Sequence, residues 1–238
     1  MVNYSKSDNS LTGSVAIVTG GSRGIGFAIA NALADEGCKI VVCSRTSTEV
    51  KKAEKVLSEK TEVLGIVADV SNTGDCKRVM EETFKKFRKM NILINNAGIS
   101  VYKTLEKTTE EEIDSILDTN LKGMIHLTRI ALPHIKKGSF GRIVNISSGL
   151  GKSGMAGFTA YCATKFGVIG FTEALAGELE GNVKVHAVCP KRTDTKMYAH
   201  RFLGAGGKGL DSPEDVARVV MEILNPNSRI PSGSAIGV

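Results

Sequence analysis

The sequence is poor in aromatic residues and has no long apolar run. Its 238 residues include no Trp, and Phe, Trp and Tyr together account for 5%. This composition gives no indication of an aromatic cage or a base-stacking surface. No apolar stretch approaches the ~20 residues of a membrane-spanning helix, and residues 1–12 lack the apolar core of a secretory signal. We therefore predict a cytoplasmic protein with no membrane partner.

Cysteine is scarce and shows no pairing pattern. The five cysteines form no CxxC motif, and the four histidines share no ligand spacing. Neither a disulfide framework nor a metal site is predicted. Buried, reduced thiols fit a cytoplasmic protein. The cysteines are Cys38, Cys43, Cys76, Cys162 and Cys189.

Contiguous basic charge is also missing, although the formal net charge is +6. A basic protein can bind nucleic acid, a membrane surface or a phosphorylated ligand. The lysines here occur in short groups, such as Lys51-Lys52 and Lys136-Lys137, with acidic residues between them. Because nucleic-acid binding favours a continuous patch, we predict no nucleic-acid partner.

The sequence does contain a regular alternation of short apolar runs and amphipathic segments. Fully apolar strands between amphipathic helices are typical of a parallel sheet covered on both faces. With right-handed crossovers, this predicts an α/β doubly wound (Rossmann) sheet of about seven strands. Strands are expected at 15–19, 40–43, 63–68, 92–94, 142–146, 183–188 and 234–238. Helices are expected at 24–36, 47–60, 73–89, 109–136, 159–179 and 213–224, the last capped by Ser212 with Pro213 at its first position.

No linker or internal repeat divides the chain. We therefore predict a single dinucleotide-binding domain over 1–238, with 1–12 as a loose N-terminal segment. Residues 190–212 are Gly-rich and irregular, and such long connections are commonly lids. We predict that 191–212 form a lid on the substrate side.

A glycine turn follows the first strand and opens the first helix. Gly20, Gly24 and Gly26 follow a GxxxGxG spacing rather than the common GxGxxG. Glycines let the backbone approach a pyrophosphate, and the helix N-terminus offers free N–H groups to it. A glycine turn alone can serve packing, but its position after the first strand favours cofactor binding.

Acidic side chains are missing at the end of the second strand, where Asp or Glu binds the ribose of NAD. The residues there are Ser44 and Arg45. Arg45 and Arg23 can pair with a 2′-phosphate through charge-assisted hydrogen bonds. We therefore predict NADP (NADPH) as the cofactor and consider NAD less favoured. Two exposed surface arginines are the alternative interpretation.

The candidate reactive pair is Tyr161 and Lys165, which are four residues apart and share one helix face. A free Tyr titrates near pH ~10, and a nearby ammonium lowers that pKa. Such a Tyr can act as a general acid in carbonyl reduction. Ser148, just past the fifth strand, can hydrogen-bond the substrate oxygen. A YxxxK pair alone also occurs by chance on helix surfaces.

These motifs occur together in a familiar order: the glycine turn, Asn95-Asn96-Ala97-Gly98, Asn120, Ser148 and Tyr161-xxx-Lys165. As a joint pattern they resemble the short-chain dehydrogenase/reductase family, nearest to its 3-oxoacyl-acyl-carrier-protein reductase-like branch, over almost the whole chain. The resemblance implies catalytic roles for Asn120, Ser148, Tyr161 and Lys165. Tyr161 would be the general acid or base, Lys165 would bind the nicotinamide ribose, Ser148 would orient the substrate, and Asn120 would hold a relay water.

The resemblance also implies a cofactor site and an oligomer. A homo-oligomer, dimer or tetramer, would pair the helices at 109–136 and 159–179. The predicted cofactor-binding residues are Gly20, Ser22, Arg23, Gly24, Ile25, Gly26, Ser44, Arg45, Asp69, Val70, Asn96, Ala97, Gly98, Tyr161, Lys165, Pro190, Thr193 and Thr195.

The chain departs from the family pattern after the sixth strand. Pro190-Lys191 stands where Pro-Gly is usual, and a Lys is strained if that turn needs a positive φ. Lys191 and Arg192 add charge that suits an anionic substrate, or they face solvent. The sequence also ends without the usual Asp-Gly-Gly segment. Apolar residues expected to line the pocket are Val101, Leu105, Leu150, Met155, Phe158, Met197, Tyr198 and Phe202.

Several functions stay open. The first is NADPH-dependent reduction of a small carbonyl compound to a secondary alcohol, with 3-oxoacyl thioesters among the candidate substrates. The second is NAD(P)-dependent oxidation of an alcohol or sugar by the same residues. The third is a non-catalytic, cofactor-binding regulatory protein, a class that commonly loses the Tyr or the Lys.

Overall fold

The computed structural model describes residues 11–191, 193 and 210–238. Its strands are β1 (Val15–Thr19), β2 (Lys39–Ser44), β3 (Val63–Val67), β4 (Ile92–Asn95), β5 (Gly141–Ile146), β6 (Val183–Cys189) and β7 (Ala235–Gly237). Its helices are α1 (Gly24–Asp35), α2 (Ser47–Leu57), α3 (Thr73–Phe87), α4 (Glu110–Leu117), α5 (Gly123–Ile135), α6 (Thr159–Glu178) and α8 (Pro213–Leu224). Short turns η1 (Leu105–Lys107), η2 (Asp118–Lys122) and η3 (Gly149–Gly151) complete the described elements.

The seven strands form one parallel sheet in the order β3-β2-β1-β4-β5-β6-β7. The order reverses between β1 and β4, because the chain first builds outward to β3 and then returns to the other side of β1. This is the doubly wound sheet that the sequence predicts. Such a sheet binds ligands at the carboxyl ends of its strands, beside the point of reversal.

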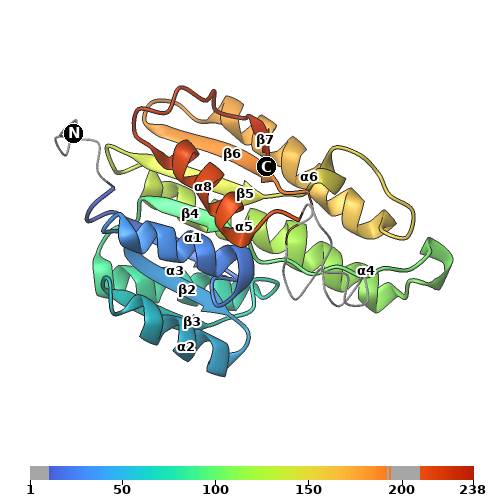
Figure 1. Ribbon diagram of the computed structural model, residues 1–238, viewed down its shortest axis with the longest axis horizontal. Coiled ribbons are helices and arrows are strands. Elements are labelled where there is room, and N and C mark those ends of the chain that lie inside the picture. Colours follow the sequence, from blue (N-terminus) through green and yellow to red (C-terminus); the bar gives the residue numbers. More distant parts are fainter. Residues whose placement is uncertain (1–10, 192, 194–209) are drawn as a thin grey trace.

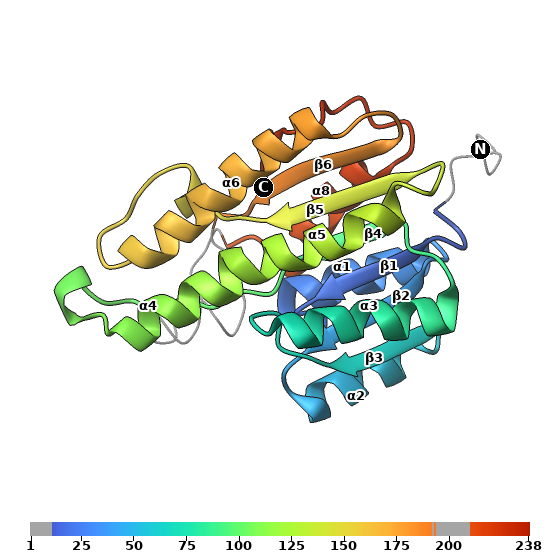
Figure 2. The same ribbon diagram turned by 180° about the vertical axis from the view of Figure 1, so that it is seen from behind.

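Helices cover both faces of the sheet. Figure 1 shows α1 and α8 on one face, and Figure 2 shows α3, α5 and α6 on the other. The strands are apolar throughout because each face packs against helices: in β1, Ala16 and Val18 belong to the core under α1 and α8, whereas Val15 and Ile17 belong to the core under α3 and α5. The continuous apolar runs thus reflect burial on both sides.

One expected helix is interrupted. The sequence predicts a continuous helix over 109–136, but the structure has α4, the π-helical turn η2 and α5 in its place. The helix begins at a capping box made by Thr109 and Glu112, and the wider turn follows two helical turns later. A π-helical turn inserts one extra residue per turn and is frequent at functional sites. Apolar periodicity does not report it, because the same face stays buried before and after it.

The structure describes only part of the two segments predicted to be irregular, residues 1–12 and 191–212. Residues 1–10 lie outside the described residues, and Leu11, which was expected in the loose segment, is instead buried at 4% exposure in the core. Of the predicted lid 191–212, most residues also lie outside the described part. Thr193 forms an isolated bridge with Asp211, which brings the two ends of this connection together.

Candidate active site

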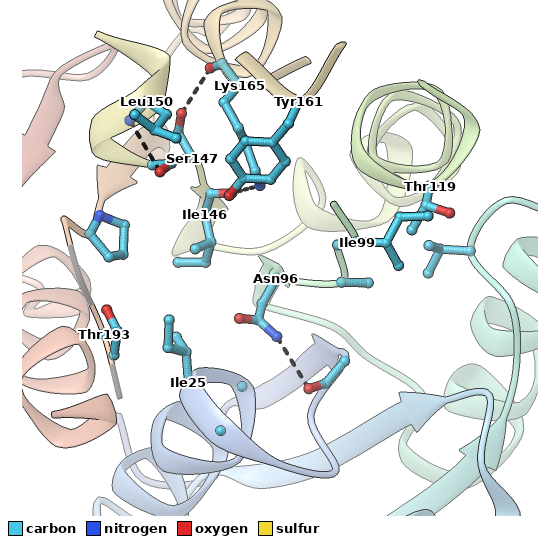
Figure 3. Close-up of a pocket in the computed structure, with 18 of the residues that line it drawn as sticks. Ile25, Asn96, Ile99, Thr119, Ile146, Ser147, Leu150, Tyr161, Lys165 and Thr193 are labelled. Carbon is cyan, nitrogen blue, oxygen red and sulfur yellow. Dashed lines mark hydrogen bonds between the residues drawn. The ribbon is translucent and has the colours of Figure 1, made fainter. Parts of the chain in front are cut away.

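A cavity of about 990 Å³ lies at the carboxyl ends of the strands. It extends from the loop after β2 across the reversal point between β1 and β4 to the loops after β5 and β6 (Figure 3). All of the predicted cofactor residues within the described part of the chain line it. Thr195 lies outside the described residues. The parallel sheet brings these distant segments together because all its strands end at the same edge.

The glycine turn forms the floor of the cavity at the start of α1. Gly20 has φ +61°, which glycine adopts without strain. A Cβ placed on Gly26 would lie only 2.3 Å from the Gly20 carbonyl oxygen and 2.4 Å from the Asn96 amide nitrogen. No side chain caps the first N–H groups of α1, where Arg23 is the N-cap residue. The turn therefore presents a close backbone surface and free donors of the kind that bind a pyrophosphate.

Thr19, at the end of β1, joins the glycine turn to the loop after β4. Its Oγ1 accepts hydrogen bonds from the backbone N–H groups of Asn96 (2.9 Å) and Ala97 (3.0 Å). The Asn96 amide nitrogen donates to the Thr19 and Gly20 carbonyls at 2.9 and 3.2 Å. Asn96 thus supports the turn from behind (Figure 3).

Polar side chains gather at the end of β2. The hydroxyls of Ser22 and Ser44 are hydrogen-bonded at 2.8 Å. Arg23 lies 3.4 Å from the Glu49 carboxylate and Arg45 lies 3.9 Å from that of Asp69. Both arginine side chains are 59% exposed, so solvent screening makes these ion pairs weak. The two guanidinium groups can still turn toward an anionic ligand.

Tyr161 and Lys165 lie together on α6, with their side chains directed into the cavity (Figure 3). The Lys165 ammonium is 5.6 Å from the centre of the Tyr161 ring and donates to the Ile146 carbonyl at 2.8 Å. Both side chains are buried. Ser148 lines the same part of the cavity, and its Oγ accepts from the Leu150 N–H at 3.1 Å. Ser148 and Tyr161 thus line one cavity together with the buried, positively charged Lys165.

Buried polar side chains hold α6 against the sheet. The Ser147 hydroxyl donates to the Lys165 carbonyl at 2.8 Å. Deeper in the protein, the Asn145 amide donates to Thr172 at 2.9 Å and accepts from Asn95 at 2.8 Å. These bonds connect β4, β5 and α6, so they determine where α6 places its reactive residues.

Asn120 lies in the π-helical turn η2 and is buried. Its side chain accepts from the Ile99 N–H and donates to the Ile99 carbonyl, both at 2.8 Å, and it also donates to Thr164 at 3.2 Å. It does not itself line the cavity, whereas its neighbour Thr119 does. The side chain therefore anchors the loop after β4, and its expected part in a water relay stays a prediction.

Part of the expected apolar wall is present. Leu150, Met155 and Phe158 line the cavity, but Val101 and Leu105 do not. The loop after β4 carries these two residues outward, and Leu105 in η1 is 56% exposed. Their neighbour Tyr102 instead packs on Phe158, with ring centroids 5.0 Å apart. Met197, Tyr198 and Phe202 lie outside the described residues.

The departure after β6 causes no backbone strain. Among the described residues other than glycine, Arg88 alone has a positive φ, so Lys191 does not need the conformation that glycine favours. The concern raised by the sequence is therefore wrong for this turn. The Pro190 carbonyl accepts from the Gly149 N–H at 2.7 Å, which joins the loops after β5 and β6. Thr193 lines the cavity, and its buried hydroxyl makes no hydrogen bond with any residue that the structure describes.

Several wall residues were not expected from the sequence. Glu49, Ser147 and Lys152 line the cavity but are not among the site residues predicted from the sequence. Glu49 comes from the first turn of α2 rather than from a strand end, so position along the sheet does not indicate it. The five cysteines are free and buried, as expected.

Two further kinds of site find no support. Among the described residues, no group of three or more His, Cys, Asp or Glu is placed to hold a metal ion. None of the helices that the structure describes has the length and apolar character needed to span a bilayer.

The cavity fits a dinucleotide and a small substrate side by side. The glycine turn supplies a close surface for phosphates, the Thr193 hydroxyl supplies a buried polar group, and the Tyr161–Lys165 pair lines the same cavity. A doubly wound sheet with this site defines the class of nicotinamide-dependent oxidoreductases.

Comparison with known proteins identifies the family. The family model described as short chain dehydrogenase matches residues 14–204. The chain is 34% identical to the 3-oxoacyl-[acyl-carrier-protein] reductase FabG of Thermotoga maritima, covering 96% of this chain and 97% of that one. It is 32% identical to dehydrogenase/reductase SDR family member 4 of Caenorhabditis elegans, covering 94% and 93%.

A solved structure agrees with these relatives. The 3-ketoacyl-(acyl-carrier-protein) reductase of Brucella melitensis, complexed with NADH, superposes with a TM-score of 0.88 at 29% identity, covering 96% of this chain and 98% of that one. The chain belongs to the short-chain dehydrogenase family and is an NAD(P)-dependent oxidoreductase that acts on a small molecule.

Proposed function

We propose that the protein, working as one dinucleotide-binding unit, reduces a carbonyl compound to a secondary alcohol with NADPH. The observation that carries this proposal is that Tyr161, Lys165 and Ser148 line the same cavity, with Tyr161 and Lys165 side by side (Figure 3). A carbonyl oxygen in that cavity would accept hydrogen bonds from the hydroxyls of Ser148 and Tyr161. When bound, the reduced nicotinamide supplies the hydride that reaches the carbonyl carbon.

Tyr161 is the proton donor in this mechanism. As negative charge develops on the carbonyl oxygen, the phenol gives up its proton and becomes a phenolate. The buried Lys165 ammonium stabilises that phenolate electrostatically, because charges interact strongly where water is excluded. The Lys165 ammonium carries three N–H groups, and we expect it also to bind the nicotinamide ribose.

Return of the proton to Tyr161 needs a path from solvent. Asn120 is our candidate for holding a relay water, since it lies in the π-helical turn beside Thr164 and close to α6. A Cβ placed on Gly98 would lie 3.3 Å from the Asn120 Oδ1 and 3.7 Å from the Lys165 ammonium. The side chains of Asn120 and Lys165 thus both lie close to Gly98.

The preference for NADPH rests on the polar group at the end of β2. Ser22, Ser44, Arg23 and Arg45 line the cavity there, and the structure leaves both guanidinium groups exposed. A 2′-phosphate brought to this group would displace weak contacts with Glu49 and Asp69 and gain stronger charge-assisted bonds. The presence of Glu49 supports NADH as the second candidate, because a carboxylate can bind a free ribose hydroxyl.

Replacement of Tyr161 with Phe tests the mechanism. Because general acid catalysis contributes typically 10²–10⁴-fold, we expect kcat to fall by at least about a hundredfold while the Kd for NADPH stays within a few-fold. Turnover would be followed by NADPH absorbance over a panel of ketones and 3-oxoacyl thioesters. Turnover near the wild-type rate in Tyr161→Phe would exclude this mechanism.

Replacement of Arg45 with Ala tests the cofactor. We expect NADPH affinity to fall by roughly tenfold, as for loss of a bond to a charged group, and NADH affinity to change little. Glu49→Gln is the matched variant. It removes the carboxylate that is paired with Arg23 at the same end of the cavity, and it should weaken NADH binding alone. Equal loss of both cofactors in Arg45→Ala would contradict the 2′-phosphate assignment.

Two other functions remain to be compared with this one. Oxidation of an alcohol or sugar would use the same residues in reverse, so rates in both directions decide between them. The relatives named as 3-oxoacyl-[acyl-carrier-protein] reductases make 3-oxoacyl thioesters a first substrate class to assay. A non-catalytic regulatory role is disfavoured because Tyr161 and Lys165 are both present and lie together in the cavity.

A further inference from the structure

On the substrate side of the cavity, two lysines carry positive charge and have no acidic partner in the described part of the chain. Lys152 and Lys191 line the walls built by the loops after β5 and β6, where Lys165 also lies. The two carboxylates of the described lining, Glu49 and Asp69, are at the opposite end of the cavity. The arginines of the cofactor end thus have acidic neighbours, whereas Lys152 and Lys191 have none among the residues that the structure describes.

Lys191 lies directly against the substrate loop. A Cβ placed on Gly149 would be 3.5 Å from the Lys191 Cα and 3.6 Å from its Cγ. Gly149 follows Ser148, which we propose to bind the reacting oxygen. Lys191 therefore lies against the residue that follows Ser148, and it is an exposed residue that lines the cavity.

Lys152 stands at the end of η3, on the same wall. Its ammonium donates to the Ala235 carbonyl of β7 at 2.7 Å, which leaves two further N–H donors. Its charge also acts on the buried Cys189 thiol in that wall: burial raises the pKa of this thiol, and the charges of Lys152 and Lys165 oppose the rise. Within the part of the chain that the structure describes, neither Lys152 nor Lys191 has a carboxylate within 4.0 Å.

We infer that Lys152 and Lys191 form an anion subsite, and that the substrate is an oxo acid whose carboxylate lies a few bonds from the reacting carbonyl. This inference rests on the proposed carbonyl reduction. The substrate would gain a hydride at carbon and a proton from Tyr161 at oxygen, and leave as the hydroxy acid. Leu150, Met155 and Phe158 would enclose its carbon chain. A wall that carries two ammonium groups favours an anion, because its positive potential raises the local concentration of negative ligands.

The chemistry separates an oxo acid from its uncharged derivatives. A thioester or methyl ester has no charge next to the reacting carbonyl, so it gains nothing from either lysine. A phosphate at the same distance would be recognised in the same way, since an ammonium binds both anions as a point charge. Phosphorylated ketones therefore belong in the assay as a separate arm.

The experiment measures kcat/KM for matched pairs: 3-oxobutanoate and its methyl ester, and dihydroxyacetone phosphate and dihydroxyacetone. The variants are Lys152→Gln and Lys191→Gln, because Gln removes the charge but keeps an N–H donor for the Ala235 carbonyl. Lys85→Gln, on the exposed surface of α3, is the control. We expect the wild type to prefer the acid over the ester, and each cavity variant to lower the acid-to-ester ratio by about tenfold, chiefly through KM.

Binding of the hydroxy acid to the NADPH-loaded protein is measured in parallel, by competition or thermal shift. If the wild type reduces esters or thioesters at least as well as acids, with no effect of either lysine on the ratio, the carbonyl reductase stands and the anion subsite is wrong. If no carbonyl compound is reduced but the acid binds in a lysine-dependent way, the subsite stands and the proposed function fails. A phosphate preference would contradict the carboxylate assignment. Weaker NADPH binding in the variants at an unchanged acid-to-ester ratio would overturn the inference, because the lysines would then serve the cofactor.

Discussion

At the scale of single residues, the glycine turn is the tightest part of the site. The side of Gly26 that a Cβ would occupy is filled by backbone of Gly20 and by Asn96. We predict that Gly26→Ala weakens NADPH binding by more than tenfold and costs about 1–3 kcal/mol of stability, as overpacking does. Affinity titration and urea denaturation measure the two effects.

The matched control for this substitution is Gly177→Ala. Gly177 lies in α6, and a Cβ there would meet no atom within 4 Å. Alanine should therefore raise stability by up to about 1 kcal/mol, because it favours the helix and reduces the freedom of the unfolded chain. A Gly26→Ala protein as stable and as cofactor-competent as Gly177→Ala would show that the close approach is not needed.

His186 makes the stability dependent on pH. It is fully buried in β6, and burial, with the charges of Arg142 and Lys184, lowers the pKa of its imidazole. The native protein therefore keeps His186 neutral at a pH where the unfolded chain, with a pKa near ~6.5, binds a proton. Because the unfolded state binds more protons, stability should fall as the pH drops below about 6.5, by up to ~1.4 kcal/mol per pH unit.

His186→Gln should remove this contribution. Denaturation midpoints of the two proteins would be compared between pH 8 and pH 5.5. Above pH 7 we expect a constant difference between them, and below about pH 6.5 we expect the wild type to lose stability more steeply than His186→Gln. Parallel curves for both proteins across the whole range would mean that His186 does not titrate differently in the two states.

At the scale of elements, the helices depend on their caps to different extents. Ser212 forms a capping box with Asp215 at the start of α8: its hydroxyl accepts from the Asp215 N–H at 3.1 Å, and the Asp215 carboxylate accepts from the Ser212 N–H at 2.9 Å. The buried residues Val216 and Val220 of α8 pack in the core under α1. We predict that Ser212→Ala costs about 1 kcal/mol, measured by urea denaturation.

Thr46 provides the comparison at the start of α2. It is also an N-cap residue, but its side chain makes no capping hydrogen bond. Thr46→Ala should therefore change the free energy of unfolding by less than about 0.5 kcal/mol. If both substitutions cost the same, the capping box does not account for the effect at Ser212.

At the scale of the whole molecule, the exposed face of α6 has few charged residues, which is unusual for a helix that faces solvent. Between Thr159 and Thr172 its only charged residue is the buried Lys165, and Phe166 is 46% exposed. A helix without a charged outer face is typically covered. We propose that this face of α6 packs against a second copy of the chain, as the homo-oligomer predicted from the sequence requires. Figure 2 shows α6 on the outside of the helical layer.

Light scattering after gel filtration tests this association. The wild type should elute as a dimer or tetramer, and Phe166→Glu should shift it toward the monomer, because a buried unpaired charge at an interface is costly. Val56→Glu, which changes an exposed apolar residue of α2, should leave the mass unchanged. A monomeric wild type would rule out the oligomer.

The sequence by itself determined the strands, the sheet class and most members of the site. Fully apolar strand runs and helix caps such as Ser212-Pro213 are local signals, and their positions agree with the structure to within one or two residues. The motif residues around Gly20, Asn96 and Tyr161 were likewise recognisable, because each follows directly from a predicted strand or lies at helical spacing.

Only the tertiary structure decided which other side chains join them. The interruption of the long helix at η2, the arrival of Glu49 from α2 and the outward course of Leu105 depend on contacts between segments far apart in the chain. The same is true of Lys152, whose bond to Ala235 spans 83 residues. Apolar periodicity reports which face of an element is buried, but it carries no information on which polar groups the packed elements bring together.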